Sequence, residues 1–228
     1  MVKKRLYLFV LFLFVSLLSV FAQRHLVEYE LTPRPIVITE KLKNSEEVKY
    51  HNQLKLSVLL EFDHTGYAFK VDDKEFENLS RSGDFRYSRK RSALIIGQYY
   101  QLYYNANDNV LCLYWDSWKS RNPEVFDWIL TNETAEINGY RVYKAYVDVP
   151  YISAKGVNRI NNVVAWYCPD IPYGYSPLGY HGLPGLVLSL ESFGSKYVAK
   201  RIIFNASKEA ITPPKEYNKL KEQALKSK

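Results

Sequence analysis

Cysteine is scarce in this chain, which excludes the zinc sites and redox motifs that need several clustered thiols. The 228 residues contain only Cys112 and Cys168, so there is no CxxC pair and no cluster with the spacing of a zinc site. Each cysteine stands in an apolar, aromatic segment, where it would serve either as half of one disulfide or as a buried thiol. The sequence leaves these two interpretations open, and it predicts no metal centre and no cofactor.

Catalytic and nucleotide-binding motifs are also missing. The chain contains no GxSxG nucleophile elbow, no HExxH motif, no Walker loop and no GxGxxG after a strand. His181 is a candidate general base, but no nucleophile lies at a recognisable spacing, so a role in a turn is favoured. We therefore predict no catalytic residues and a protein that is not an enzyme.

Glycine and proline contribute only ten residues each, and 24% of the residues are charged, which excludes a collagen-like or low-complexity chain. Tyrosine, in contrast, occurs 20 times against a single methionine. Tyrosine favours pleated, half-buried surfaces. The composition therefore predicts a mostly β fold with little helix.

Only one apolar run is long, and it lies at the beginning of the chain. Residues 1–22 combine a basic start, an apolar stretch over 6–18 and a Val20-x-Ala22 ending, which is the pattern of a signal peptide. The alternative is a retained membrane anchor. No later run is long enough to cross a bilayer. We expect cleavage before Gln23, export to the periplasm or beyond the cell, and one β-rich domain over residues 23–228.

The positive charge is weaker than the total of +7 indicates. Cleavage after residue 22 would leave 28 basic residues against 24 acidic ones, a net charge of +4. Much of the remainder is in a basic run at 81–91, read as a solvated strand edge or loop rather than an anion or lipid contact, and in the lysine-rich tail. An exported chain of this charge predicts no nucleic-acid partner.

Alternating apolar residues and turn signals predict nine or ten strands. Two hairpins are the clearest, one joining 56–62 to 67–71 and one joining 92–104 to a strand that begins at 110. The further expected strands are 25–31, 125–130, 140–149, 162–167, 186–193 and 197–204. A helical turn is expected after Asp72, and a frayed helix or tail without a continuous apolar stripe over 215–228.

Aromatic side chains gather in the second half of the chain. Large rings of this kind form either a hydrophobic core or the lining of a concave apolar face that could hold an acyl chain or an extended peptide. With His181, the residues expected at such a contact are Trp128, Tyr140, Trp166 and Tyr167.

The run Gly182-Leu183-Pro184-Gly185-Leu186 ends a stretch of about 65 residues with several further Trp, Tyr, Gly and Pro positions in a distinctive order. By this run and these positions, the stretch resembles the GLPGL family of exported proteins. Two of its positions differ from the usual pattern, because Val142 stands in place of a cysteine and Cys168 in place of a threonine or similar residue. The resemblance is carried by Trp128, Glu133, Thr134, Ile137, Gly139, Tyr140, Lys144, Ala145, Trp166, Pro169, Ile171, Pro172, Pro177 and the run Gly182, Leu183, Pro184, Gly185 and Leu186.

The resemblance implies a secreted β-rich protein of gram-negative bacteria, with a single, strongly curved antiparallel sheet similar to lipoprotein-carrier half-barrels. It also implies an outer-membrane receptor or transporter as a partner, and it assigns no activity. Residues 182–186 would form a rigid turn that delivers Leu186 into a strand, with a binding loop as the alternative.

Three functions follow as hypotheses. The first is a periplasmic binding or carrier protein for an apolar ligand or peptide, and the second is an accessory protein of an outer-membrane transporter. The third is a hydrolase whose acid or histidine converges with a partner in a cleft.

Overall fold

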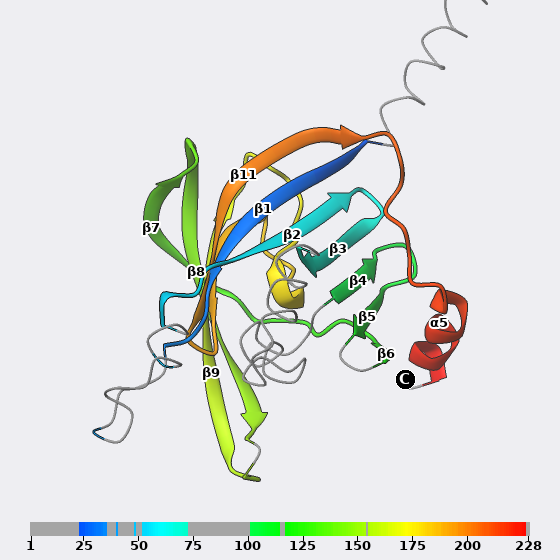
Figure 1. Cartoon of the computed structure of the whole chain (residues 1–228), viewed down its shortest axis with the longest axis horizontal. Coiled ribbons are helices and arrows are strands. Elements are labelled where there is room, and N and C mark those ends of the chain that lie inside the picture. Colours follow the sequence, from blue (N-terminus) through cyan, green and yellow to red (C-terminus); the bar gives the residue numbers. More distant parts are fainter. Residues whose placement is uncertain are drawn as a thin grey trace, which may run out of the picture.

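Eleven strands lie antiparallel in one open sheet (Figure 1). The structure is a computed structural model of the chain and describes residues 23–35, 40, 48, 52–72, 101–114, 117–153 and 155–226. The strand order is β6-β5-β4-β3-β2-β1-β11-β10-β9-β8-β7. Consecutive strands are neighbours except β6 and β7, which form the two edges, and the pairing of β1 with β11 joins the two halves. The sheet is not closed into a barrel, which confirms the predicted mostly β, antiparallel fold.

The strands have the following bounds, with β8 and β11 the longest. They are β1 (Arg24–Thr32), β2 (Leu56–Asp63), β3 (Gly66–Val71), β4 (Gln101–Asn105), β5 (Val110–Tyr114), β6 (Trp118–Arg121), β7 (Ile129–Ile137), β8 (Tyr140–Ile152), β9 (Asn158–Cys168), β10 (Leu186–Ser192) and β11 (Ser195–Ser207).

Both predicted hairpins of the first half are confirmed where the structure describes them. In the β2–β3 turn, Asp63 Oδ1 accepts hydrogen bonds from the Thr65 N–H at 2.7 Å and from Thr65 Oγ1 at 2.5 Å. In the β4–β5 turn, Asn105 Oδ1 accepts from the Asp108 N–H at 2.9 Å. These short polar side chains hold the turns, as their local hydrogen bonding predicts.

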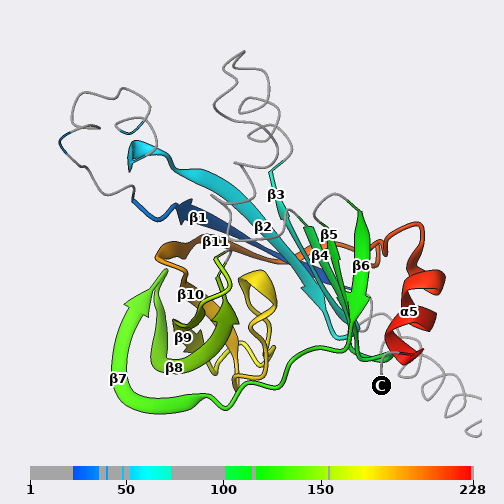
Figure 2. The ribbon, with the colours of Figure 1, turned by 90° about the horizontal axis from the view of Figure 1, so that it is seen from below.

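The sheet curls around residues 169–185, called the inner segment below (Figure 2). This segment contains the 3-10 turn η3 (Pro177–Gly179). Its Tyr173 and Tyr175 rings lie 4.9 and 6.3 Å from the ring of Phe62, which lies on β2. The concave side of the sheet is therefore filled by side chains of the chain itself.

The core lies between the inner segment and the concave face of the sheet. Strand pairing places Leu31, Tyr197 and Leu190 beside one another on β1, β11 and β10, and all three are fully buried. The buried Tyr29 hydroxyl donates to the carbonyl of Val187 at 2.6 Å and ties β1 to β10. Burial of these large side chains is the main source of stability.

Several predicted strand bounds are wrong, and β8, β9 and β11 extend beyond the expected ranges 140–149, 162–167 and 197–204. The strand expected at 125–130 begins only at Ile129 and runs to Ile137, because residues 125–128 cross to the inner segment instead. The short strand β6 was not expected, since its four residues are too few to show an alternation. The helical turn after Asp72, the basic run at 81–91 and the first nine residues of the expected strand 92–104 lie outside the described residues.

The C-terminal helix corrects another expectation. Helix α5 (Tyr217–Lys226) is a helix, as its composition predicts, but it is docked rather than frayed. Tyr217, Leu220 and Ala224 recur at helical spacing and pack into a second cluster with residues of β4 and β5 on the convex side of the sheet. No helix among the described residues is long and apolar enough to cross a membrane.

Candidate functional site

Two of the predicted contact residues, Trp128 and His181, meet at the rim of the inner segment. The Trp128 indole N–H donates to the carbonyl of His181 at 3.2 Å. The His181 ring stacks on Tyr104, with ring centroids 5.3 Å apart and an interplanar angle of 17°. Trp128 and Tyr104 both pack against the core at this edge.

The surroundings of His181 favour its neutral form. Burial lowers the pKa of the imidazole, and Arg121 nearby lowers it further, while the Gly179 carbonyl and Glu124 oppose that shift. His181 Nδ1 lies 2.9 Å from the Gly179 carbonyl oxygen, which can only accept, so Nδ1 is the donor. One ring nitrogen is thus held by the backbone, as the predicted turn role requires.

Tyr167 lines a different and smaller pocket. Its ring lies 6.1 Å from that of Tyr143 on the neighbouring strand. With Arg141, Pro169 and Asp170, the two tyrosines enclose about 200 Å³, less than the roughly 300 Å³ at which ligand sites usually begin. Burial raises the pKa of Tyr167, so its hydroxyl stays protonated at neutral pH.

The remaining two predicted residues lie elsewhere. Trp166 directly precedes Tyr167 on β9, so its side chain lies on the opposite face of the sheet. Its strand partners are Lys144 on β8 and Ser189 on β10. Tyr140 begins β8 beside the β7–β8 turn, where Asn138 Nδ2 donates to the Ala199 carbonyl at 2.7 Å. Trp128, Tyr140 and Trp166 are partly buried against the core, and Tyr167 belongs to it. The five residues therefore do not lie together, and all of them except His181 pack in or against the core.

The GLPGL run is a turn under strong steric constraint. Gly182 has a φ of 96°, in the left-handed region, and a Cβ on Gly185 would lie 2.1 Å from the carbonyl oxygen of Cys168. Leu183 is buried, and Leu186 starts β10 opposite Cys168. Of the two interpretations, the rigid turn that feeds a strand accounts for these contacts.

Both cysteines are free and buried, so the structure shows the buried-thiol alternative rather than a disulfide. Cys168 belongs to the main core and Cys112 to the cluster under α5. Burial raises the pKa of Cys112 to about 12 and also raises that of Cys168. In the described part of the chain, no three His, Cys, Asp or Glu side chains gather as metal ligands.

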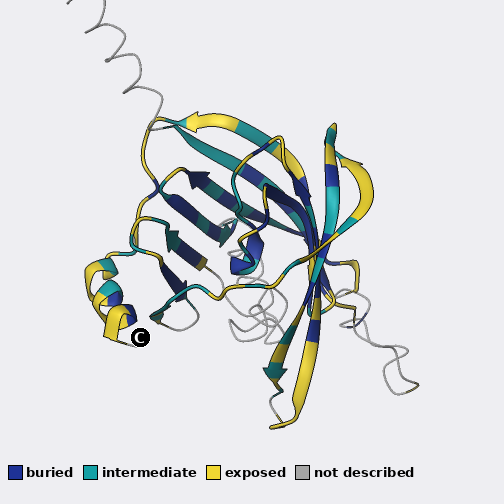
Figure 3. Cartoon of the chain, turned by 180° about the vertical axis from the view of Figure 1, so that it is seen from behind, coloured by how far each residue is buried: buried dark blue, intermediate teal, exposed yellow. Residues whose placement is uncertain are grey.

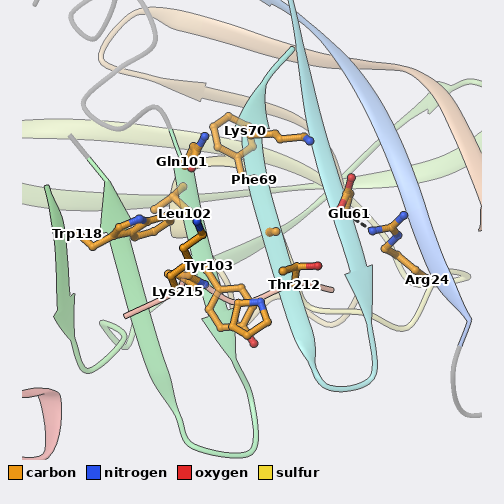
Figure 4. Close-up of a pocket in the computed structure, with 13 residues that line it drawn as sticks. Arg24, Glu61, Phe69, Lys70, Gln101, Leu102, Tyr103, Trp118, Thr212 and Lys215 are labelled. Atoms are coloured by element: carbon orange, nitrogen blue, oxygen red, sulfur yellow. Dashed lines mark hydrogen bonds and ion pairs between the residues drawn. The ribbon is translucent and has the colours of Figure 1, made fainter. Parts of the chain in front are cut away.

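The larger cavity lies on the convex face of the sheet, which the sequence did not single out. This groove has a volume of about 540 Å³, within the range of ligand sites (Figure 4). Side chains of β1 to β4 and β6 line it, and residues 212–215 form its wall on the way to α5. The polar and aromatic lining residues are Arg24, Glu61, Phe69, Lys70, Gln101, Tyr103, Trp118, Thr212 and Lys215.

The charges of the groove are mostly positive. Arg24 and Glu61 form an ion pair at 3.2 Å and neutralise each other. Lys70 and Lys215 form no ion pair with any described residue, and Glu61 is the one carboxylate among the described lining residues. Tyr103 packs edge-on against Tyr217 of α5, with ring centroids 5.3 Å apart. The groove thus offers two free ammonium groups above an aromatic floor.

Alternation alone could have shown part of this groove. Lys70 and Gln101 are paired across β3 and β4 on the face opposite the core residues Phe69 and Leu102. What alternation could not show is the wall, because residues 212–215 reach this face only through the tertiary path between β11 and α5.

Comparisons with known proteins add little beyond this geometry. A family model described as "Protein of unknown function (Porph_ging)" matches residues 152–189, which include all of β9, the inner segment and the start of β10. No curated protein matches the chain. The GLPGL resemblance stays a prediction.

Two solved structures, described as "Structure of PNGF-II in C2 space group" and "Structure of PNGF-II in P21 space group", are similar to the chain. They align at 17% identity with TM-scores of 0.47 and 0.46 over 87% and 86% of this chain. The chain spans about 30% of the length of those proteins.

Proposed function

We propose that the protein is an exported binding protein that holds an elongated anionic ligand, an acidic peptide segment, in the convex groove. The observation that carries this proposal is the 540 Å³ groove with Lys70 and Lys215 free to bind carboxylates. An apolar ligand on the concave face is not favoured, since Tyr173 and Tyr175 of the inner segment pack there against Phe62.

The shape of the groove supports an elongated ligand. Trp118 and Arg24 lie at its opposite ends in Figure 4, on β6 and β1. Five strand spacings separate these strands, about 24 Å, which is the length of roughly seven extended residues. Ammonium groups would bind acidic side chains of such a peptide, and Trp118 and Tyr103 would bury its apolar parts.

The proposal is one of binding without catalysis. In the groove as described, the carboxylate of Glu61 is held in its ion pair with Arg24. His181, the candidate base, lies at the rim of the inner segment with Nδ1 bonded to the Gly179 carbonyl. If the acidic peptide belongs to an outer-membrane transporter, this binding would make the protein the transporter's accessory protein, which is the second hypothesis from the sequence.

Export is part of the proposal and rests on the pattern of residues 1–22. Expression of the full chain in a gram-negative host tests it. The protein recovered from the periplasm should have the mass of residues 23–228, whereas a membrane-bound product of full mass would contradict cleavage.

Peptide binding is the direct test of the groove. Fluorescence anisotropy with a labelled hexaglutamate peptide should show saturable binding to the periplasmic protein that weakens with added salt, and hexalysine should not bind. Lys70→Glu with Lys215→Glu should weaken binding at least about tenfold, because like charges then oppose the ligand. Lys155→Glu with Lys196→Glu makes the same charge change at exposed sites outside the groove and should leave the affinity nearly unchanged.

Two outcomes would overturn the groove proposal. Absence of hexaglutamate binding is one, and an equal loss in both double variants is the other, since it would indicate only a general effect of net charge. Native mass spectrometry adds a third comparison. An acyl lipid that copurifies equally with the wild-type protein and the groove variant would favour the carrier hypothesis instead.

A further inference from the structure

The hairpin formed by β8 and β9 extends beyond the body of the protein (Figures 1 and 3). Two contacts anchor its base to the body. The buried Asn161 Nδ2 donates to Tyr180 Oη at 3.2 Å and to Ser192 Oγ at 3.0 Å, and the ring of Tyr151 lies 5.0 Å from that of Phe193 between β10 and β11. Beyond that point the two strands pair only with each other, as in the pairs Pro150 with Ile160 and Ile152 with Asn158. Residues 149–160 are called the distal hairpin below.

The distal hairpin exposes aliphatic side chains. Ile152 is 71% exposed, Ile160 is 68% exposed and Val157 is 49% exposed. The pairing register places Ile152 and Ile160 on the same face, because successive residues of a strand alternate between faces. Exposed isoleucines grouped at a projecting tip indicate an interaction surface.

The tip has a defined conformation among the described residues. The Val157 N–H donates to Ser153 Oγ at 3.2 Å, and the Ser153 N–H donates to the Val157 carbonyl at 2.9 Å. A further bond joins the Gly156 N–H to the Ser153 carbonyl at 2.8 Å. These hydrogen bonds hold Val157 beside Ser153 at the end of the hairpin.

The charges around these side chains have one sign. Lys155 and Arg159 are exposed in the distal hairpin, and the sequence has no Asp or Glu from Val149 to Cys168. The closest acidic residue toward the base is Asp148, whose Oδ1 accepts a hydrogen bond from Asn162 Nδ2 at 2.8 Å. Aliphatic side chains flanked by cations match a bilayer whose headgroups are anionic.

We infer that the distal hairpin docks the protein on a membrane that contains anionic phospholipids, with Ile152, Val157 and Ile160 inserted between headgroups and Lys155 and Arg159 bound to phosphates. A stable protein interface usually buries about 800 Å² on each partner. A narrow two-stranded tip with three exposed aliphatic residues is small for that purpose, whereas shallow insertion needs no wider surface. This role is independent of the groove and goes beyond peptide binding.

Vesicle flotation tests the inference with the periplasmic protein after its mass has shown whether residues 1–22 are present. The protein should float with vesicles of phosphatidylglycerol and phosphatidylcholine, and far less with phosphatidylcholine alone. Ile152→Ser with Ile160→Ser should lower the bound fraction at least about fivefold. Lys155→Gln with Arg159→Gln should lower it on anionic vesicles and weaken its dependence on salt.

Ile129→Ser with Leu130→Ser is the matched control. These two residues of β7 are 52% and 53% exposed but lie outside the distal hairpin, so flotation should not change. Flotation that is absent from the wild-type protein, or that persists in the Ile152→Ser and Ile160→Ser variant, would overturn the inference. The inference would also be overturned if the distal hairpin were required to form a protein complex and the protein did not float with vesicles.

Discussion

The imidazole of His181 lies between the ring of Tyr104 and the carbonyl of Gly179. Because burial lowers its pKa below the usual 6.5, the unfolded chain binds a proton more readily than the folded protein at mildly acidic pH. The stability due to neutral His181 is therefore fully present above about pH 6.5 and is lost as the pH falls through the lower pKa of the folded state.

This sign predicts a pH-dependent effect of His181→Asn. The substitution should destabilise the protein more at about pH 7.5 than at about pH 5, because the wild-type protein has already lost part of the His181 contribution in acid. Free energies of unfolding in urea at the two pH values test this. His25, whose pKa is also lowered by burial, is present in both proteins and cancels in the comparison. Parallel pH dependences of the two proteins would contradict the prediction.

Gly185 and Gly182 require glycine for different reasons, which allows a second prediction. A side chain at Gly185 would meet the backbone, whereas Gly182 has a positive φ in open space. Gly185→Ala should cost about 3 kcal/mol, because the new Cβ would overlap the Cys168 backbone. Gly182→Ala should cost only about 1 kcal/mol, because its positive φ is strained while the surrounding space is open. Urea unfolding of the two variants measures the difference, and equal losses would show that backbone approach at Gly185 is not limiting.

At the scale of elements, α5 shows how a short helix becomes stable by docking. The helix places Leu220 and Ala224 on the cluster around Cys112. Polar contacts add to this, because Asp108 accepts from Tyr217 Oη at 2.7 Å and from Lys221 Nζ at 2.6 Å. These hydrogen bonds lower the pKa of Asp108, so the carboxylate stays ionised at neutral pH. Packing rather than helix propensity holds such a helix in place.

Leu220→Ala should destabilise the protein by about 2–4 kcal/mol, as is usual when a buried leucine is truncated. Leu225→Ala, on the same helix, removes a side chain that is 48% exposed and should change stability by no more than about 0.5 kcal/mol. Chemical unfolding compares the two variants. A helix that frays in solution would make both substitutions equally mild.

At the scale of the whole molecule, pairing of β1 with β11 joins the first half of the chain to the second. The inner segment then fills the concave side, while the groove lies on the convex side and the distal hairpin projects from the body. Noncovalent packing holds this arrangement among the described residues, since Cys112 and Cys168 are free thiols in separate clusters.

A reducing agent should therefore leave the melting temperature of the periplasmic protein unchanged. Loss of a native disulfide would cost about 2–5 kcal/mol and lower the melting temperature by several degrees. Alkylation after denaturation without reductant should add two adducts, one each at Cys112 and Cys168. A protein that takes up no adduct until it is reduced would contradict the prediction.

What the sequence determined by itself was local. The alternation in β1 to β3 and the polar turns at Asp63 and Asn105 act between near neighbours, so they can be recognised without knowledge of the fold. The mostly β class and the rigid turn at Gly182 to Leu186 follow from the same local rules.

Only the tertiary structure decided which of these elements meet. Trp128 and His181 come together although 53 positions separate them, while the adjacent Trp166 and Tyr167 face opposite sides of β9. The wall of the groove reaches β1 to β4 from residues 212–215. Such contacts depend on how the strands pair and where the chain crosses the sheet, and the periodicity of residues along the sequence determines neither.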